Sequence, residues 1–383
     1  MSHLHGDLYV YYKASRELLG GGDPYYAEAP QLLFGPLYLY PPFFAFLLTP
    51  ICLLDPAPCG AIWAVVLGAG WFWGQALIRT LQGRDGAPLS FLDVLPALLL
   101  LRPLWNGWSQ GQVTLMLLPL LLLSLVRYRR GCVVSSAFLL AFAGSIKIFP
   151  LFLGIIFLGP GRRVGLVWLC LFCLILGALP ALEVGPGRFV DLVSNGFLGT
   201  AAKAIESRQF HPANCSPLPT ACRLVGLGST SVIKELLLLS ILVITAVLLW
   251  IRPAADGGHR ETLWLALVWT SMIVVCPILW NQYLALLLFP LSVVLQHACR
   301  PRWDLVRCGL VGFFIVAAAL FDSNSTTLLG KELAAANDGR GLPALGVLIF
   351  WSGLLFSFVM SHREQTGKIG DGSDPGAVGR VQP

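Results

Sequence analysis

The dominant pattern along the chain is a succession of long apolar runs separated by short polar turns. Runs that approach the roughly 20 residues needed to cross a bilayer of about 30 Å are typical of transmembrane helices. The pattern therefore predicts an all-α, polytopic integral membrane protein with about eleven transmembrane helices. The runs lie at residues 60–80, 91–104, 112–126, 132–147, 148–159, 164–182, 232–251, 262–279, 283–298, 305–320 and 343–361.

Composition agrees with a membrane protein. Hydrophobic residues make up 56% of the 383 residues and charged residues only 12%, with a net charge of +6. A soluble domain carries about 25% charged residues. These values exclude a soluble globule, a disordered chain and a nucleic-acid binder. They leave open a channel, a transporter or an enzyme that acts on a lipid-borne substrate.

Basic residues predict the direction of the runs. Under the positive-inside rule, the clusters at residues 127–130 and 162–163 belong on the same, inner side of the membrane. Two crossings must lie between them, which places a break near Lys147 and Pro150. Eleven spans then put the N-terminus outside, although residues 1–5 form no signal peptide. We therefore expect that the chain starts late, at an internal Met, and lacks a twelfth, N-terminal helix.

The predicted orientation in the membrane divides the chain into three parts. Residues 1–59 form a first outer loop, residues 60–361 form the transmembrane domain with a long outer loop at 183–231, and residues 362–383 form a disordered inner tail. In the first loop, the helical spacing of Leu8, Ser15 and Leu19 predicts a juxtamembrane helix that ends at three successive glycines. The apolar segment 40–59 is interrupted by prolines and runs for only about 14 residues between breaks, which is too short to span, so it predicts a helix at the interface.

Several polar residues stand out against this apolar background. Asp7 occupies the N-cap position of the first predicted helix, so it is either a helix cap or a functional carboxylate. Lys147 is an intramembrane cation that either snorkels to the surface or contacts a bound phosphate. The remaining candidates lie in the outer connections WNGWSQGQ, CPILWNQY and FHPANCSPLPTACRL, the last with a predicted short helix at Pro219–Leu224 that carries Arg223.

The ten cysteines are scattered. Cys170 and Cys173 have CxxC spacing but lie in an apolar helix, where thiols usually serve as small packing residues. Cys215 and Cys222 flank a polar loop and either form a disulfide or remain thiols. Since there is no DxD pair and the carboxylates of the first loop are not spaced as metal ligands, we predict metal-independent chemistry without a cofactor.

The order of six segments resembles glycosyltransferase family 87, the polyprenol-phosphate-mannose-dependent α-mannosyltransferases of the C superfamily of membrane glycosyltransferases. The matching segments are GDLYVYYKASRELLGGGDPYY, LYLYPPFFAFLLTP, NGWSQGQ, GSIKIFPLFL, NCSPLPTACRL and CPILWNQYLALLLFPL, which run from residue 6 to about residue 290. The resemblance implies an enzyme of the bacterial inner membrane with its active site on the periplasmic side.

The resemblance also implies the chemistry and its residues. A hexose, expected to be mannose, moves from a polyprenyl phosphate to a lipid or glycan acceptor with inversion, and Asp7 is the general base. The leaving phosphate requires cations. The expected phosphate-binding residues are Arg223, Lys147, Arg208 and His211. The expected substrate pocket comprises Tyr11, Tyr40, Pro41, Asn106, Gln110, Gln112, Asn214, Trp280, Asn281, Gln282 and Tyr283.

One position departs from the family pattern. Members often have a His after the Trp of the WNQY-like segment, where this chain has Asn281 and Gln282. This puts a His role in phosphate recognition in doubt. Two other classes of function remain open: a carrier that flips a lipid-linked sugar, and a non-catalytic scaffold. A carrier would tolerate Asp7→Asn, whereas a transferase would not.

Overall fold

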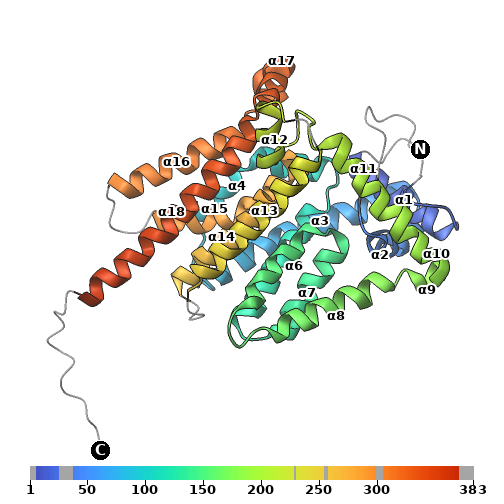
Figure 1. The fold of residues 1–383 in the computed structure, drawn as a ribbon, viewed down its shortest axis with the longest axis horizontal. Coiled ribbons are helices and arrows are strands. Elements are labelled where there is room, and N and C mark those ends of the chain that lie inside the picture. Colours follow the sequence, from blue (N-terminus) through green and yellow to red (C-terminus); the bar gives the residue numbers. More distant parts are fainter. Residues whose placement is uncertain (1–5, 26–37, 228–229, 254–257, 299–304, 371–383) are drawn as a thin grey trace, which may run out of the picture.

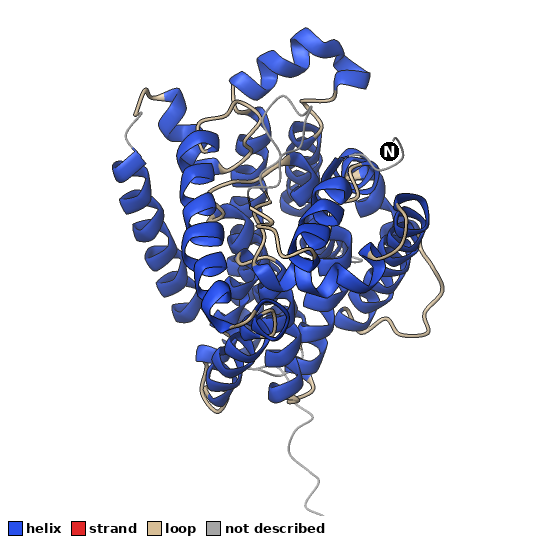
Figure 2. Cartoon of the chain, turned by 90° about the vertical axis from the view of Figure 1, so that its right-hand side faces the viewer, coloured by secondary structure: helices blue, strands red, loops and turns tan. Residues whose placement is uncertain are grey.

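The fold is entirely helical across the part of the chain that the structure describes (Figure 2). The structure is a computed structural model that describes residues 6–25, 38–227, 230–253, 258–298 and 305–370. The predicted all-α class is confirmed. The α-helices are α1 (Gly6–Leu19), α2 (Pro42–Cys52), α3 (Pro56–Leu81), α4 (Phe91–Leu99), α5 (Leu101–Ser109), α6 (Thr114–Arg129), α7 (Val133–Ile146), α8 (Val164–Ala178), α9 (Ala181–Val184), α10 (Pro186–Asp191), α11 (Gly199–Arg208), α12 (Pro217–Leu224), α13 (Thr230–Trp250), α14 (His259–Val274), α15 (Leu288–Ala298), α16 (Leu305–Phe321), α17 (Thr326–Gly339) and α18 (Leu342–Gly370); η1 (Phe149–Leu158) and η3 (Asn281–Leu287) are 3₁₀ helices, and η2 (Leu192–Leu198) is a π-helix.

Each of the eleven predicted apolar runs is largely helical, although several are broken. Four helical segments are long and apolar enough to cross a membrane: Pro56–Leu81, Val164–Val184, Val232–Trp250 and Leu342–Ser361. Two bent pairs raise the number to six if each pair is one span: Leu101–Ser109 with Thr114–Arg129, bent by 116°, and Cys308–Phe321 with Thr326–Gly339, bent by 81°. The described residues therefore support a membrane protein with four to six such spans by length and composition.

The helices form two packed groups. In one group α3 packs on α6, α6 on α7 and α7 on α8; in the other, α18 packs on both α16 and α14 (Figure 1). Helix α14 is enclosed, because every side chain from Glu261 to Ile273 is buried. By contrast, α8 and α13 expose large apolar side chains such as Leu174 and Trp250. Exposed apolar side chains of this kind suit helices that face lipid.

The predicted break near Lys147 is present. Helix α7 ends at Ile146, and Lys147 has the extended backbone angles φ −150° and ψ 128°. The chain then continues as η1, which folds back on α7. Gly144 permits this contact, because a Cβ at this position would overlap the side chain of Leu151. The break leaves the Lys147 side chain at the end of a helix instead of in its middle.

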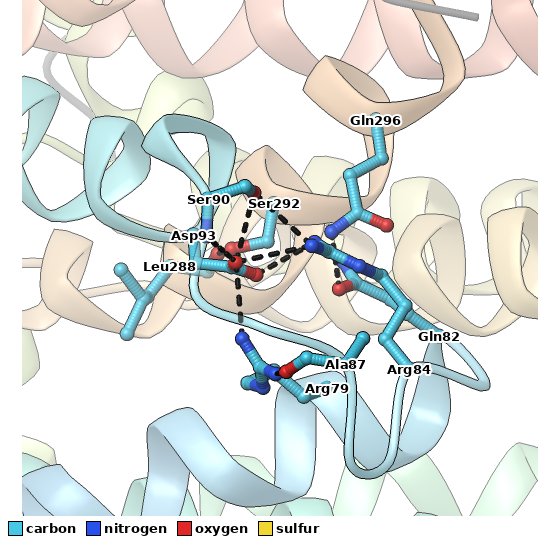
Figure 3. A network of polar contacts seen from close by, with 9 residues as sticks. All are labelled: Arg79, Gln82, Arg84, Ala87, Ser90, Asp93, Leu288, Ser292 and Gln296. Atoms are coloured by element: carbon cyan, nitrogen blue, oxygen red, sulfur yellow. Dashed lines mark hydrogen bonds and ion pairs between the residues drawn. The ribbon is translucent and has the colours of Figure 1, made fainter.

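A polar network fixes the turn that follows α3 (Figure 3). The Asp93 carboxylate accepts from Arg79 at 3.0 Å and from Arg84 at 2.6 Å, and it also accepts from the Ser90 hydroxyl at 2.9 Å. Trp63, near the other end of α3, bonds to Gly111. At 1.5 Å per residue, Trp63 and Arg79 lie about 24 Å apart along the helix. The network therefore holds the end of α3 that is remote from Gly111.

Other features refine the predicted organisation. The segment after Tyr40 forms the short helix α2, and the predicted short helix that carries Arg223 is α12. Cys215 and Cys222 are buried free thiols, so no disulfide joins them. The prediction of a disordered tail from residue 362 is wrong for its first nine residues, because α18 continues to Gly370. Residues 1–5 and 26–37 of the predicted first loop and 371–383 of the tail lie outside the described residues.

Candidate active site

Asp7 is positioned by a close crossing between the start of α1 and the turn after α5. The Asp7 backbone N–H donates to the Gln110 carbonyl at 2.9 Å. Gly111 has φ +65°, and a Cβ at this position would lie 2.8 Å from Leu8 Cβ. Glycine adopts this left-handed conformation at little cost, and here it also avoids the overlap. The crossing therefore fixes the first turn of α1 against the segment that carries Gln110 and Gln112.

The Asp7 carboxylate bonds to a buried amide instead of capping its own helix. Gln112 donates from Nε2 to Asp7 Oδ2, and Gln112 is only 2% exposed. The Tyr11 and Tyr40 hydroxyls lie 2.7 Å apart and bond to each other, and the Gln112 carbonyl oxygen, 3.5 Å from both, accepts from the hydroxyl whose hydrogen is not used in that bond. Between the two readings of Asp7, this contact favours a functional carboxylate held in a set orientation.

A polar cavity of about 330 Å³ surrounds Asp7. It brings together segments from the first loop, the α5–α6 turn, the α7–η1 break, α11 and the start of η3. Most of its lining residues are ones that the sequence singled out. They are Asp7, Leu39, Tyr40, Asn106, Gln110, Gln112, Lys147, Arg208, Trp280, Gln282 and Tyr283. Leu39 is the one lining residue that the sequence did not predict, because an apolar residue in an apolar segment gives no signal.

Lys147 brings a buried positive charge into this cavity. Its Nζ lies 3.4 Å from the ring centroid of Tyr283 and 5.0 Å from that of Tyr40. Such cation–π contacts offset part of the cost of burying an ammonium group. Nζ is buried and has no hydrogen-bond partner within the described residues. Its burial under aromatic rings argues against snorkelling and leaves three N–H donors available to a bound anion.

Burial and nearby charges set the acidity of Asp7. Burial raises the pKa of Asp7 to about 6, while the positive charges of Lys147 and Arg208 oppose this rise. Burial destabilises the ionised form of a carboxylate, and a nearby cation stabilises it. Asp7 is therefore mostly ionised at pH 7, yet it is more basic than an exposed carboxylate.

An apolar groove of about 470 Å³ adjoins the polar cavity. The two share Leu39, Lys147, Trp280 and Tyr283. The rest of the groove is lined almost wholly by apolar side chains of η1, α11, α14 and the segment after α14, among them Phe152, Ile205 and Met272. The site therefore offers a charged polar compartment and an apolar compartment that meet at Lys147.

Two of the predicted phosphate-binding residues do not line the cavity. Arg223 donates to the backbone carbonyls of His211, at 2.7 Å, and Asp338, at 3.0 Å. The His211 ring packs edge-on against Trp280, with 5.6 Å between the ring centroids. His211 thus lies behind a wall of the cavity, and Arg223 ties the loop before α12 to the end of α17. Lys147 and Arg208 are the two predicted phosphate ligands that the structure brings together.

Four of the predicted pocket residues also lie outside the lining. Asn214 is buried and bonds to backbone groups of Gln209, Ser216, Pro277 and Leu279, so it clamps the loop before α12 to the loop after α14. Tyr11 and Asn281 lie one layer behind the cavity, where they bond to the lining residues Tyr40 and Asn106. Pro41 precedes α2 and accepts a hydrogen bond from Tyr38.

The described residues contain no group of three or more His, Cys, Asp or Glu side chains that could hold a metal ion. The positive charge of the cavity comes from Lys147 and Arg208. The predicted metal independence remains a prediction that only an assay can test.

These features define a helical membrane protein with a buried carboxylate in a cationic cavity beside an apolar groove. The model of glycosyltransferase family 87 matches residues 38–279, which is more than half of the chain. The chain therefore belongs to glycosyltransferase family 87. The match includes Tyr40, Lys147 and Arg208, while Asp7 lies before its first residue. Comparison with curated proteins gives no significant match.

Proposed function

We propose that this glycosyltransferase moves a hexose, with mannose as the expected sugar, from a polyprenyl phosphate to a lipid or glycan acceptor. The reaction would take place at the periplasmic face of the bacterial inner membrane, with about eleven transmembrane helices around the site. The observation that carries the proposal is the junction of the Asp7 cavity with the apolar groove at Lys147. A donor with a sugar, a phosphate and an isoprenoid tail has the same order of polar, charged and apolar parts.

Asp7 acts as the general base in this scheme. The acceptor hydroxyl gives its proton to the Asp7 carboxylate while its oxygen bonds to the anomeric carbon. The bond from this carbon to the phosphate oxygen breaks, and the phosphate leaves with the bonding electrons. Attack from the face opposite the phosphate inverts the anomeric centre, so a β-linked donor gives an α-linked product.

Lys147 and Arg208 stabilise the leaving phosphate. The charge on the phosphate rises as the bond breaks, so cations held beside it lower the barrier. Lys147 supplies N–H donors that no described residue occupies, and Arg208 adds a second charge on the same cavity. The amides of Gln110, Gln112 and Gln282 can bond to sugar hydroxyls, with Trp280 as an apolar wall.

The test is transfer of radiolabelled mannose from polyprenyl-phosphate-mannose by membranes that express the chain. Transfer by the wild type that is lost in Asp7→Asn would support the proposal. Membranes without the chain provide the background. If the wild type used a water-soluble nucleotide sugar directly, without a polyprenyl phosphate, the proposed donor class would be wrong.

The same preparation tests the chemical identity of the donor. Polyprenyl phosphates that carry glucose or galactose should be poorer donors than the mannosyl compound if the expected sugar is correct. Equal transfer of all three would contradict mannose specificity while retaining the lipid-phosphate donor.

A further inference from the structure

A row of polar side chains leads from the cavity to a charged cluster behind it. Asn106 lines the cavity and donates from Nδ2 to Asn281 Oδ1 at 3.1 Å. Asn281 donates from its own Nδ2 to Asn324 Oδ1 at 3.3 Å. Arg102 donates from Nε to Asn324 Oδ1 at 3.2 Å. Arg102 and Asn106 are four residues apart on α5 and so share a face of that helix.

The orientation of each Asn side-chain amide in this row follows from its hydrogen-bond partners. An Asn side chain carries one acceptor and one donor end, and its orientation must be assigned from its partners. Arginine has only donors, and Arg102 also donates to the Asn324 backbone carbonyl at 2.7 Å and to the Ser325 hydroxyl at 3.0 Å. Asn324 donates from Nδ2 to the Asp338 carboxylate at 2.9 Å. A donor-only group and a carboxylate thus fix Asn324 from both ends.

Asn281 receives its direction from the same arrangement. Its Nδ2 donates to the Phe321 backbone carbonyl at 2.9 Å as well as to Asn324. A backbone carbonyl can only accept, so the amide of Asn281 cannot reverse without losing both bonds. Its Oδ1 therefore faces Asn106 and accepts from Asn106 Nδ2. Asn281 and Asn324 are each 7% exposed, so water competes little for these bonds.

The last member of the row differs from the others. Within the described residues, no donor reaches Asn106 Oδ1, although its Nδ2 is held by Asn281. This oxygen belongs to a residue that lines the same cavity as Asp7.

We infer that Asn106 presents its side-chain carbonyl oxygen to a donor-sugar hydroxyl, and that Arg102, Asn324 and Asn281 are positioning residues that set this direction. The inference rests on the proposed function for the identity of the ligand. It assigns Asn106 the role of an acceptor that selects for a hydroxyl at one ring position. Fluorine at that position cannot donate a hydrogen bond and would not satisfy it.

The experiment uses polyprenyl-phosphate-mannose donors in which each sugar hydroxyl is replaced in turn by fluorine. Fluorine changes the intrinsic reactivity of the sugar, so each donor is compared between the wild type and Asn106→Ala. At one position, we expect the kcat/KM loss in the wild type to exceed that in Asn106→Ala by about tenfold, the effect of one hydrogen bond. Equal losses in both proteins at every position would overturn the inference.

Arg102→Gln tests the positioning role, because Arg102 does not line the cavity. In Arg102→Gln, the loss of kcat/KM that fluorine causes should be smaller than in the wild type and close to the loss in Asn106→Ala. We expect the change to lie mainly in KM. Arg127→Gln is the matched control, because Arg127 is an exposed arginine on α6 that lies outside the row. An Arg102→Gln protein that keeps the full discrimination of the wild type would show that Arg102 does not position Asn106.

A second measurement separates failure of this inference from failure of the proposed function. If the wild type transfers no sugar from any polyprenyl phosphate, the proposed function is wrong, and thermal unfolding then tests the row itself. Arg102→Gln, Asn281→Ala and the double variant form a cycle between two side chains that both bond to Asn324. Non-additive shifts in Tm support the row, and additive shifts overturn it.

Discussion

Asp7→Asn should abolish most of the sugar transfer while leaving the fold intact. Asn keeps a carbonyl oxygen that can accept from Gln112 Nε2, so the contact that orients residue 7 survives. With a pKa of about 6, about nine-tenths of the Asp7 carboxylate is ionised at pH 7. The variant therefore removes the carboxylate that serves as the base under the proposed function. Loss of a general base costs about 10²- to 10⁴-fold in rate, or about 2.7 to 5.4 kcal/mol.

The same substitution should affect the donor KM differently from kcat. Asp7 places a negative charge near Lys147, and therefore near the expected phosphate, so neutral Asn removes a like-charge repulsion against the donor. We therefore expect kcat to fall at least a hundredfold while the donor KM stays the same or falls. Initial rates with radiolabelled donor measure both constants. Glu17→Gln, on the same helix but absent from the cavity lining, is the control for loss of a carboxylate.

The pH dependence of kcat/KM provides a further test of Asp7. A base must be ionised, so wild-type kcat/KM should fall about tenfold per pH unit as the pH drops below about 6. The residual activity of Asp7→Asn should lack this limb. A variant with a third or more of the wild-type rate, or one that keeps the limb near pH 6, would refute the role of Asp7.

Three further outcomes are expected. Lys147→Met removes the ammonium group that would bind phosphate, so donor kcat/KM should fall by about 10- to 150-fold, the effect of a charged hydrogen bond. The Tm should not fall, because the variant no longer buries a charge. A large drop in Tm with unchanged kinetics would contradict this prediction. Gly111→Ala should lower the free energy of unfolding by more than Gly131→Ala. Both glycines have positive φ, but only a Cβ at position 111 would lie too close to another atom, Leu8 Cβ at 2.8 Å. Equal losses of stability would show that the crossing tolerates a methyl group. Exhaustive chelation should leave the transfer rate unchanged, and a loss that Mg²⁺ or Mn²⁺ restores would disprove metal independence.

Much of the helical framework could be predicted because each element has a local cause. Apolar runs predicted the long helices, and the charge clusters on either side of Lys147 predicted the break after α7. Helix α17 was missed because its sequence, TTLLGKELAAANDG, is too polar to form an apolar run. The number of spans was harder to predict, because a break such as the one at Leu100, between α4 and α5, interrupts a run without changing its composition.

The site was predictable to the extent that its residues differ from their surroundings. Asp7 and Lys147 are charges in apolar or aromatic segments, and the structure places both in one cavity. Arg223 looked equally suitable, but the orientation of α12 directs it to backbone carbonyls instead. Nothing in the sequence distinguishes an arginine that faces a cavity from one that braces a loop, because the answer depends on how α12 packs on α18.

The charges of the cavity imply that substrate binding itself tunes the base. In the free protein, Lys147 and Arg208 hold the pKa of Asp7 below the value that burial alone would give. A bound donor brings a phosphate anion to these cations and partly neutralises them, so the pKa of Asp7 should rise in the complex. The profile of kcat/KM reports the free enzyme, and that of kcat reports the complex. The acidic limb of kcat should therefore lie at higher pH than that of kcat/KM, because Asp7 should be a stronger base once the proposed donor is bound.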